Sequence, residues 1–120
     1  MPKTTAEVRQ RVGEDLGLVP VGQNLEAQDV TRIDAAYLEQ YERIKEKGLA
    51  AWPSTGPIQD KFVPSLCLLI ASRLLVSYSV PESRYVRISN EAGPDGKLAL
   101  ANLAELVTPE FESHSEPADY

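Results

Sequence analysis

Residues 59–80 read QDKFVPSLCLLIASRLLVSYSV, and this stretch decides the fold. Its apolar residues recur three or four positions apart, which is the period of an α-helix. The main stripe consists of Phe62, Val63, Leu66, Leu69, Ile70, Leu74 and Tyr78. Further apolar residues beside this stripe leave little polar surface, so the helix needs cover on several sides. We therefore expect it to form the centre of a small helical bundle.

The limits of this central helix are set by polar and proline residues. It begins either at Asp60, which is able to cap it, or at Pro64, because proline fits the first turn of a helix. Pro81 marks its expected end. The stretch is short for a membrane span and contains Arg73, so we expect no membrane segment.

Two amphipathic helices are expected before the central one. The first covers residues 4–16, with Thr4 or Thr5 as the cap and Glu7 completing a capping box, and Gly17 ends it. The second runs from a cap at Asn24 to about Lys47, where Gly48 stops it. Its apolar stripe is Val30, Ile33, Tyr37, Tyr41 and Ile44.

The loop at 49–57 contains the only tryptophan of the chain. Its prolines and Gly56 forbid a helix and favour extended and turn conformations. Trp52 in such a loop has two interpretations. It either anchors the loop by filling the edge of the bundle, or it is exposed and contacts a partner.

The segment after Pro81 is read as two short helices separated by a break. We expect helix over 82–91, a turn at Ala92-Gly93-Pro94-Asp95-Gly96, and a helix over 97–106. A strand at 85–88 is the alternative, because Tyr-Val-Arg-Ile alternates and is partly β-branched.

From Val107 the composition changes. Residues 108–120 contain four acids, two prolines and no base, and they are not expected to form a helix by themselves. The predicted fold is therefore all-α: a small antiparallel helical bundle over residues 1–106, with an extended acidic C-terminal arm over 107–120. The residues predicted to bind a partner are Trp52 in the loop and, in the arm, Phe111, Glu112, Glu116, Pro117, Asp119 and Tyr120.

Composition limits the possible functions. The chain has 120 residues and 42% apolar residues, which is enough for one domain with one core. A net charge of -6 argues against a protein that grips nucleic acid by neutralising phosphates. Cys67 is the only cysteine and His114 the only histidine, so we expect no disulfide within the chain and no metal site. No secretory signal is evident, and we expect a soluble protein.

No catalytic constellation is recognisable. His114 lies between two serines in the polar tail and lacks a third group to orient it. The carboxylate pairs Glu39/Glu42 and Glu110/Glu112 could in principle mimic a glycosidase dyad, but solvated acids on a helix face or in a tail are far commoner. We predict neither an enzyme nor a cofactor, and favour a binding or structural role.

The order of motifs resembles the head-to-tail adaptor proteins of tailed bacteriophages, also called connector, head-completion or tail accessory factors. The resemblance rests on Leu-Ala-Ala-Trp at 49–52, a proline-containing turn at 53–58 and Ile-Ala-Ser-Arg-Leu at 70–74. Ser-Val-Pro at 79–81 and the acidic ending Ser-Glu-Pro-Ala-Asp-Tyr at 115–120 complete it. These motifs span most of the chain, although each is short.

The resemblance implies a structural virion protein made in the host cytoplasm. Such proteins form rings at the head–tail interface, commonly of twelve copies, which join the portal protein to tail or nozzle proteins. Genomic DNA passes through the ring without specific binding, and the arms reach neighbouring subunits or the portal. The chain departs from the family at Gly93-Pro94-Asp95-Gly96, where a helix usually continues. The alternative function is a small helical protein-binding module of regulatory or antitoxin-like type.

Overall fold

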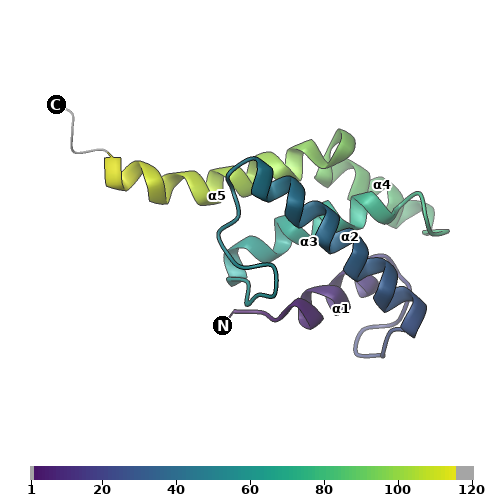
Figure 1. Ribbon diagram of the computed structural model, residues 1–120. Helices are drawn as coiled ribbons and strands as arrows, with labels where there is room; N and C mark the ends of the chain where they lie inside the picture. The colour runs from purple at the N-terminus through teal and green to yellow at the C-terminus, as the bar shows by residue number, and fades with distance from the viewer. Residues whose placement is uncertain (1, 116–120) are drawn as a thin grey trace.

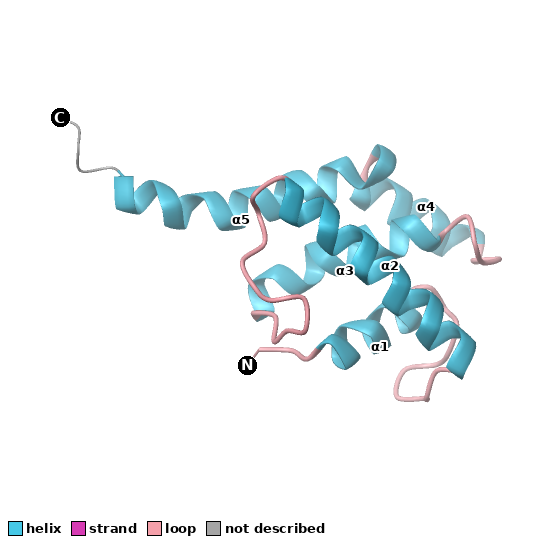
Figure 2. Cartoon of the chain, in the orientation of Figure 1, coloured by secondary structure: helices cyan, strands magenta, loops and turns pink. Residues whose placement is uncertain are grey.

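A computed structural model describes the backbone of residues 2–115 and the side chains of residues 2–107. The chain folds into an all-α bundle (Figures 1 and 2). In chain order the elements are α1 (Thr5–Asp15), α2 (Ala27–Glu46), the 3-10 turn η1 (Asp60–Phe62), α3 (Val63–Leu74), α4 (Glu82–Ala92), the 3-10 turn η2 (Pro94–Gly96) and α5 (Lys97–Ser115). Within the described backbone the only β-type pairing is an isolated bridge between Lys3 and Ile58.

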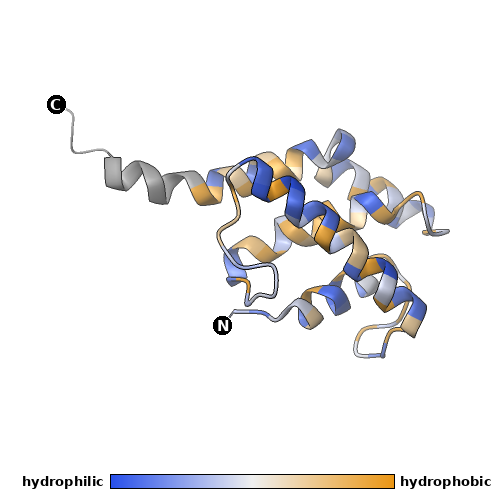
Figure 3. Cartoon of the chain, in the orientation of Figure 1, coloured by the Kyte–Doolittle hydropathy of each residue, from blue (hydrophilic) through white to orange (hydrophobic). Residues whose placement is uncertain are grey.

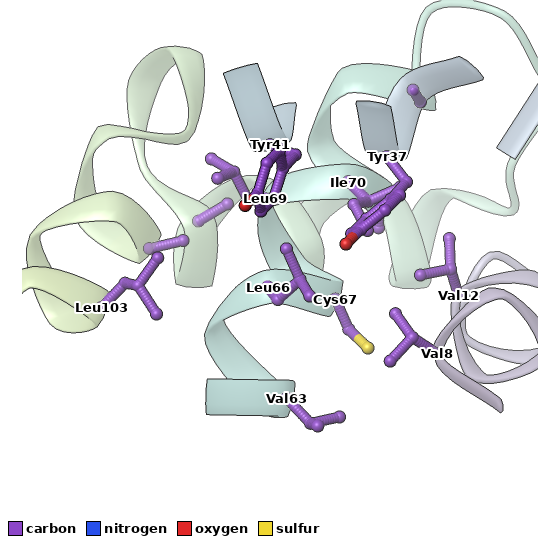
Figure 4. Close-up of a cluster of buried hydrophobic side chains, with 14 of the residues drawn as sticks. Val8, Val12, Tyr37, Tyr41, Val63, Leu66, Cys67, Leu69, Ile70 and Leu103 are labelled. Atoms are coloured by element: carbon purple, nitrogen blue, oxygen red, sulfur yellow. The ribbon is translucent and has the colours of Figure 1, made fainter. Parts of the chain in front are cut away.

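Helix α3 is the centre of the bundle, as its sequence predicts. It packs against α1, α2, α4 and α5, and its ribbon is largely apolar in Figure 3. Leu66 and Ile70 are fully buried, and Figure 4 shows α3 side chains lying between Val8 and Val12 of α1 on one side and Leu103 of α5 on the other. Burial of this apolar surface is the dominant stabilising contribution to the fold.

The limits of α3 differ from the predicted ones. The chain enters through η1 at Asp60, and the regular helix begins at Val63 with Pro64 in its first turn, so both expected starting points are used. The helix ends at Leu74, not near Pro81. A tight turn follows, and the Tyr78 hydroxyl donates a hydrogen bond of 2.9 Å to the Asp29 carboxylate. This contact with α2 draws the chain away from the axis of α3.

Helix α1 starts as predicted and α2 does not. Thr4 caps α1, and Glu7 closes the capping box by accepting from the Thr4 amide. Helix α2 begins at Ala27, three residues after the predicted cap Asn24, and its N-cap Glu26 makes no side-chain hydrogen bond. At its other end α2 stops at Glu46, where Gly48 has a φ of 73° and supplies the left-handed turn.

Helix α4 confirms the helical interpretation of residues 82–91 and excludes the strand. The predicted break is a sharp corner in which Gly93 has a φ of 78° and Gly96 a φ of 71°. A Cβ atom on Gly96 would lie 2.6 Å from Cδ1 of Leu69. Glycine is therefore required there by both backbone conformation and close packing.

Helix α5 is longer than predicted. We expected helix over 97–106 and an extended chain from residue 107, and that boundary is wrong for the described backbone, because α5 runs to Ser115. Val107 is 4% exposed and belongs to the core of the bundle. Extending a helix that is already anchored costs far less than nucleating one, which explains the difference. Figure 1 shows the end of α5 pointing away from the bundle.

Candidate interaction surface

Trp52 lies in the core, so its predicted contact with a partner is wrong and its role as an anchor is confirmed. The side chain is 5% exposed. Its ring lies between those of Tyr41 and Phe62, with centroid distances of 6.1 and 5.3 Å. The indole N–H donates to the Tyr37 hydroxyl oxygen at 3.2 Å. A buried indole with a satisfied donor is a structural residue.

Two tyrosines of α2 fasten the Trp52 loop. Tyr41 donates its hydroxyl to the Trp52 carbonyl at 2.6 Å, and Tyr37 donates to the Ser54 carbonyl at 2.9 Å. Burial raises the pKa of the Tyr37 hydroxyl, so it stays neutral and able to donate. Side chains of α2 therefore pair two carbonyls of a loop that forms no regular secondary structure.

The other predicted partner-binding residues lie towards the C-terminal end. Phe111 and Glu112 fall within the backbone of α5, and their side chains lie outside the described residues. Glu116, Pro117, Asp119 and Tyr120 lie outside the described residues altogether. Their assignment to partner binding stays a prediction.

A groove of about 570 Å³ lies between α2, α3, α4 and η2. Its volume falls within the range of pockets that bind ligands. We call it the corner groove, because the glycine corner between α4 and α5 forms one wall. Its lining includes Gln40 and Arg43 of α2, Leu69 and Arg73 of α3, Val76 just after α3, Tyr85 of α4 and Asp95 of η2.

A chain of polar contacts crosses the corner groove. Arg73 binds the Glu39 carboxylate through Nε and Nη2, and this pairing raises the pKa of Arg73. Arg43 donates to the Asp95 carbonyl at 2.9 Å, with its Nη2 3.7 Å from the Asp95 carboxylate.

Gln40 lies between the two arginines and is only 4% exposed. Its amide makes two long hydrogen bonds, with Glu39 at 3.5 Å and Arg43 at 3.4 Å. Such distances mark weak hydrogen bonds. The amide of Gln40 at the floor of the groove therefore has only weak hydrogen-bond partners within the chain.

One rim of the corner groove is apolar and exposed. Val76, just after α3, is 78% exposed, and Tyr85 of α4 is 43% exposed.

Helix α4, which carries Tyr85, is largely exposed. All of residues 82–87 are exposed, and within α4 only Ile88 and Ala92 are buried. Arg84 fastens this end of α4 by donating to the carbonyls of Glu14 and Asp15 at the end of α1. An apolar rim beside guanidinium groups suits a ligand with both apolar and anionic groups.

The described residues offer little for covalent or metal chemistry. Among them no group of three His, Cys, Asp or Glu residues is placed to hold a metal ion. Burial raises the pKa of the Cys67 thiol to about 12, which keeps it protonated and unreactive at neutral pH. None of the helices in this part of the chain is long and apolar enough to cross a bilayer.

Comparison of the chain with protein-family models, with curated proteins and with solved structures found no match. What the chain does must therefore be inferred from its own residues. The corner groove was not predicted from the sequence. Arg73 within the apolar stretch and the glycines at 93 and 96 were the available signals, but only the fold brings them together.

Proposed function

We propose that this chain is a structural virion protein of a tailed bacteriophage: an adaptor that forms a ring between the capsid portal and the tail and extends the DNA channel. In this role it binds the portal protein, tail or nozzle proteins and copies of itself, and it catalyses no reaction. The observation that carries the proposal is helix α5, which is anchored in a compact body and then leads away from it (Figure 1).

The anchoring of α5 makes it suitable as a tether. Ala99, Leu103 and Val107 are buried against the rest of the bundle. Beyond them the helix continues to Ser115, and the sequence that follows contains acids, proline and tyrosine. A segment of this kind is suited to order itself on a partner, with aromatic residues as anchors. Because the first part of α5 is fixed in the bundle, the helix directs the segment that follows it away from the body.

The charge of the chain suits a channel through which DNA moves. The net charge is -6. Acidic walls repel the phosphate backbone, so DNA slides past them and does not adhere. The absence of a basic excess also favours passage over specific binding. The motif resemblance described above supplies the specific architecture, a ring under the portal.

The test is attachment to a portal. Purified chain is mixed with the portal protein of a tailed phage and imaged by electron microscopy, beside a variant that lacks residues 109–120. We expect the complete chain to add a ring of density below the portal and the shortened variant to leave the portal bare. Circular dichroism must show that the shortened variant keeps the helical content expected of α1 to α4 and of α5 up to residue 108. Full attachment without residues 109–120 would contradict the tether.

The corner groove favours a second candidate function, a small protein-binding module of regulatory or antitoxin-like type. Its exposed rim at Val76 and Tyr85 is compatible with a partner other than a portal. The same mixtures distinguish the two functions by mass. A stable small complex with a host protein, with no ring on the portal, supports the second one.

A further inference from the structure

We propose that the corner groove is the receptor for residues 116–120 of a second copy of this chain, Glu-Pro-Ala-Asp-Tyr. The inference rests on the part of the proposed function in which copies associate. It adds the site on the body that the C-terminal segment of a neighbouring copy occupies.

The charges of the groove and the segment are complementary. Arg43 and Arg73 both line the groove, and their side chains are 25% and 50% exposed. Each guanidinium has five N–H donors, more than its hydrogen bonds to Glu39, Gln40 and Asp95 occupy. The segment brings two carboxylates, Glu116 and Asp119. Arginine–carboxylate pairs are the strong, directional contacts of such interfaces.

The apolar parts also correspond. The rim of the groove exposes Val76 and Tyr85, and Leu69 lies at its base. The segment contains Tyr120 as an aromatic anchor and Pro117, which restricts the free chain and so lowers the entropy lost on binding. Gln40 at the floor offers its weakly bonded amide to a peptide backbone. The segment thus provides a partner for each kind of group that lines the groove.

The length of α5 prevents a chain from filling its own groove. The groove borders η2, directly before the first residue of α5. A helix of 19 residues is about 28 Å long, whereas five extended residues span about 18 Å at most. Five residues beyond Ser115 are therefore too few to lead back to the groove at the base of α5, whose far end points away from the bundle (Figure 1). The occupant must come from another molecule.

A contact of this kind joins two different surfaces, so it is heterologous. Each copy presents one groove and one segment, and repeated contacts close into a ring when the geometry allows.

Two variants test the groove and the segment independently. Val76→Asp places a carboxylate on the exposed groove rim, and its matched control is Val21→Asp on an equally exposed valine in the loop between α1 and α2. Glu116→Gln/Asp119→Asn/Tyr120→Ala removes the anchors of the segment.

The experiment is sedimentation velocity on full-length chains without any portal, over a range of concentrations. We expect the wild-type chain and Val21→Asp to associate, and the groove and segment variants to associate at least about tenfold more weakly. A mixture of the groove variant with the segment variant restores one contact per pair, so it must form a one-to-one dimer. Asp95→Asn removes a competing carboxylate, 80% exposed, and must strengthen association of the otherwise wild-type chain.

The outcomes separate the inference from the proposed function. A wild-type chain that stays monomeric overturns the inference, and so does equal weakening by Val76→Asp and Val21→Asp. A mixture of the two defective variants that fails to dimerise also overturns it. If the chains associate as expected but no ring forms on a portal, the groove assignment stands and the virion role fails. If rings form on portals while Val76→Asp has no effect, only the groove assignment fails.

Discussion

Helices α3 and α4 are similar in length and follow each other in the chain, yet their surroundings are opposite. In α3 the buried residues lie on nearly every side, and four helices cover it. In α4 only Ile88 and Ala92 are buried, and residues 82–87 are exposed. Helix α3 is thus held by burial of apolar surface on most of its sides, whereas α4 buries only Ile88 and Ala92 and is fastened by the contacts of Arg84 with α1. The first arrangement makes a core, and the second leaves a surface available for binding.

The largest expected difference between the two helices is in thiol accessibility. Cys67 in α3 is buried, and its thiol has a pKa of about 12. We expect it to react with a disulfide reagent only through opening of the fold, on the order of a thousandfold more slowly than a cysteine placed at Ser83 in exposed α4. The measurement is the labelling rate of Ser83→Cys against wild type. Similar rates would show that α3 is far less protected than its burial indicates.

The next difference is in the cost of removing apolar side chains. Ile70→Ala in α3 should lower the free energy of unfolding by about 2–5 kcal/mol, because it leaves a cavity in a fully buried site. Val86→Ala in α4 removes a side chain that is 47% exposed and should change it by no more than about 0.5 kcal/mol. Urea unfolding followed by circular dichroism measures both. Equal losses would mean that α4 is covered in solution, as it would be in an assembly.

The corner that joins α4 to α5 touches α3, so a change there tests how the two regions are coupled. Gly96→Ala should cost about 1–3 kcal/mol, because it combines a left-handed φ with a Cβ placed 2.6 Å from Leu69. Gly22→Ala is the control, since it has the same backbone strain and nothing within 4 Å. The difference between the two losses, measured by thermal unfolding, isolates the packing contribution. No difference would show that the Leu69 side chain moves aside freely.

The smallest expected effect is that of the ion pair beside the corner groove. Arg73 and Glu39 are both about half exposed, so their pairing should contribute about 0.2–1 kcal/mol, and less in high salt. A double-mutant cycle with Arg73→Gln and Glu39→Gln measures the coupling. A larger, salt-independent coupling would indicate that the groove excludes water. Arg73 and Glu39 would then be less accessible to solvent than their exposed fractions of 50% and 53% indicate.

The sequence predicts the parts of this fold that depend on local periodicity. The apolar stretch at 59–80 predicts the central helix, and Thr4 with Glu7 predicts the start of α1. Helix α3 nevertheless ends at Leu74, and the Tyr78 hydroxyl after it bonds Asp29 on another helix, a contact between residues 49 positions apart that no local pattern predicts. The length of α5 also depends on context, since burial of Val107 anchors a helix that its own sequence would not start.

The candidate site was harder to predict than the fold. Its residues come from α2, α3, α4 and η2, and no local pattern shows that Arg43 and Arg73 face the same groove. Trp52 illustrates the opposite limit, because a loop tryptophan is compatible with burial and with exposure. The buried position of Trp52 depends on hydrogen bonds with the hydroxyl groups of Tyr37 and Tyr41, which lie on another element, α2.

The burial of Trp52 has a practical consequence for optical spectroscopy. It is the only indole in the chain, and it is enclosed by Tyr41 and Phe62 between α2 and η1. Its fluorescence emission should therefore lie at short wavelength in the native protein and shift to the red only when the packing of α2 on the central region opens. Movements confined to α4 should leave the emission unchanged. The single fluorophore thus reports opening of the core without a contribution from movements of α4.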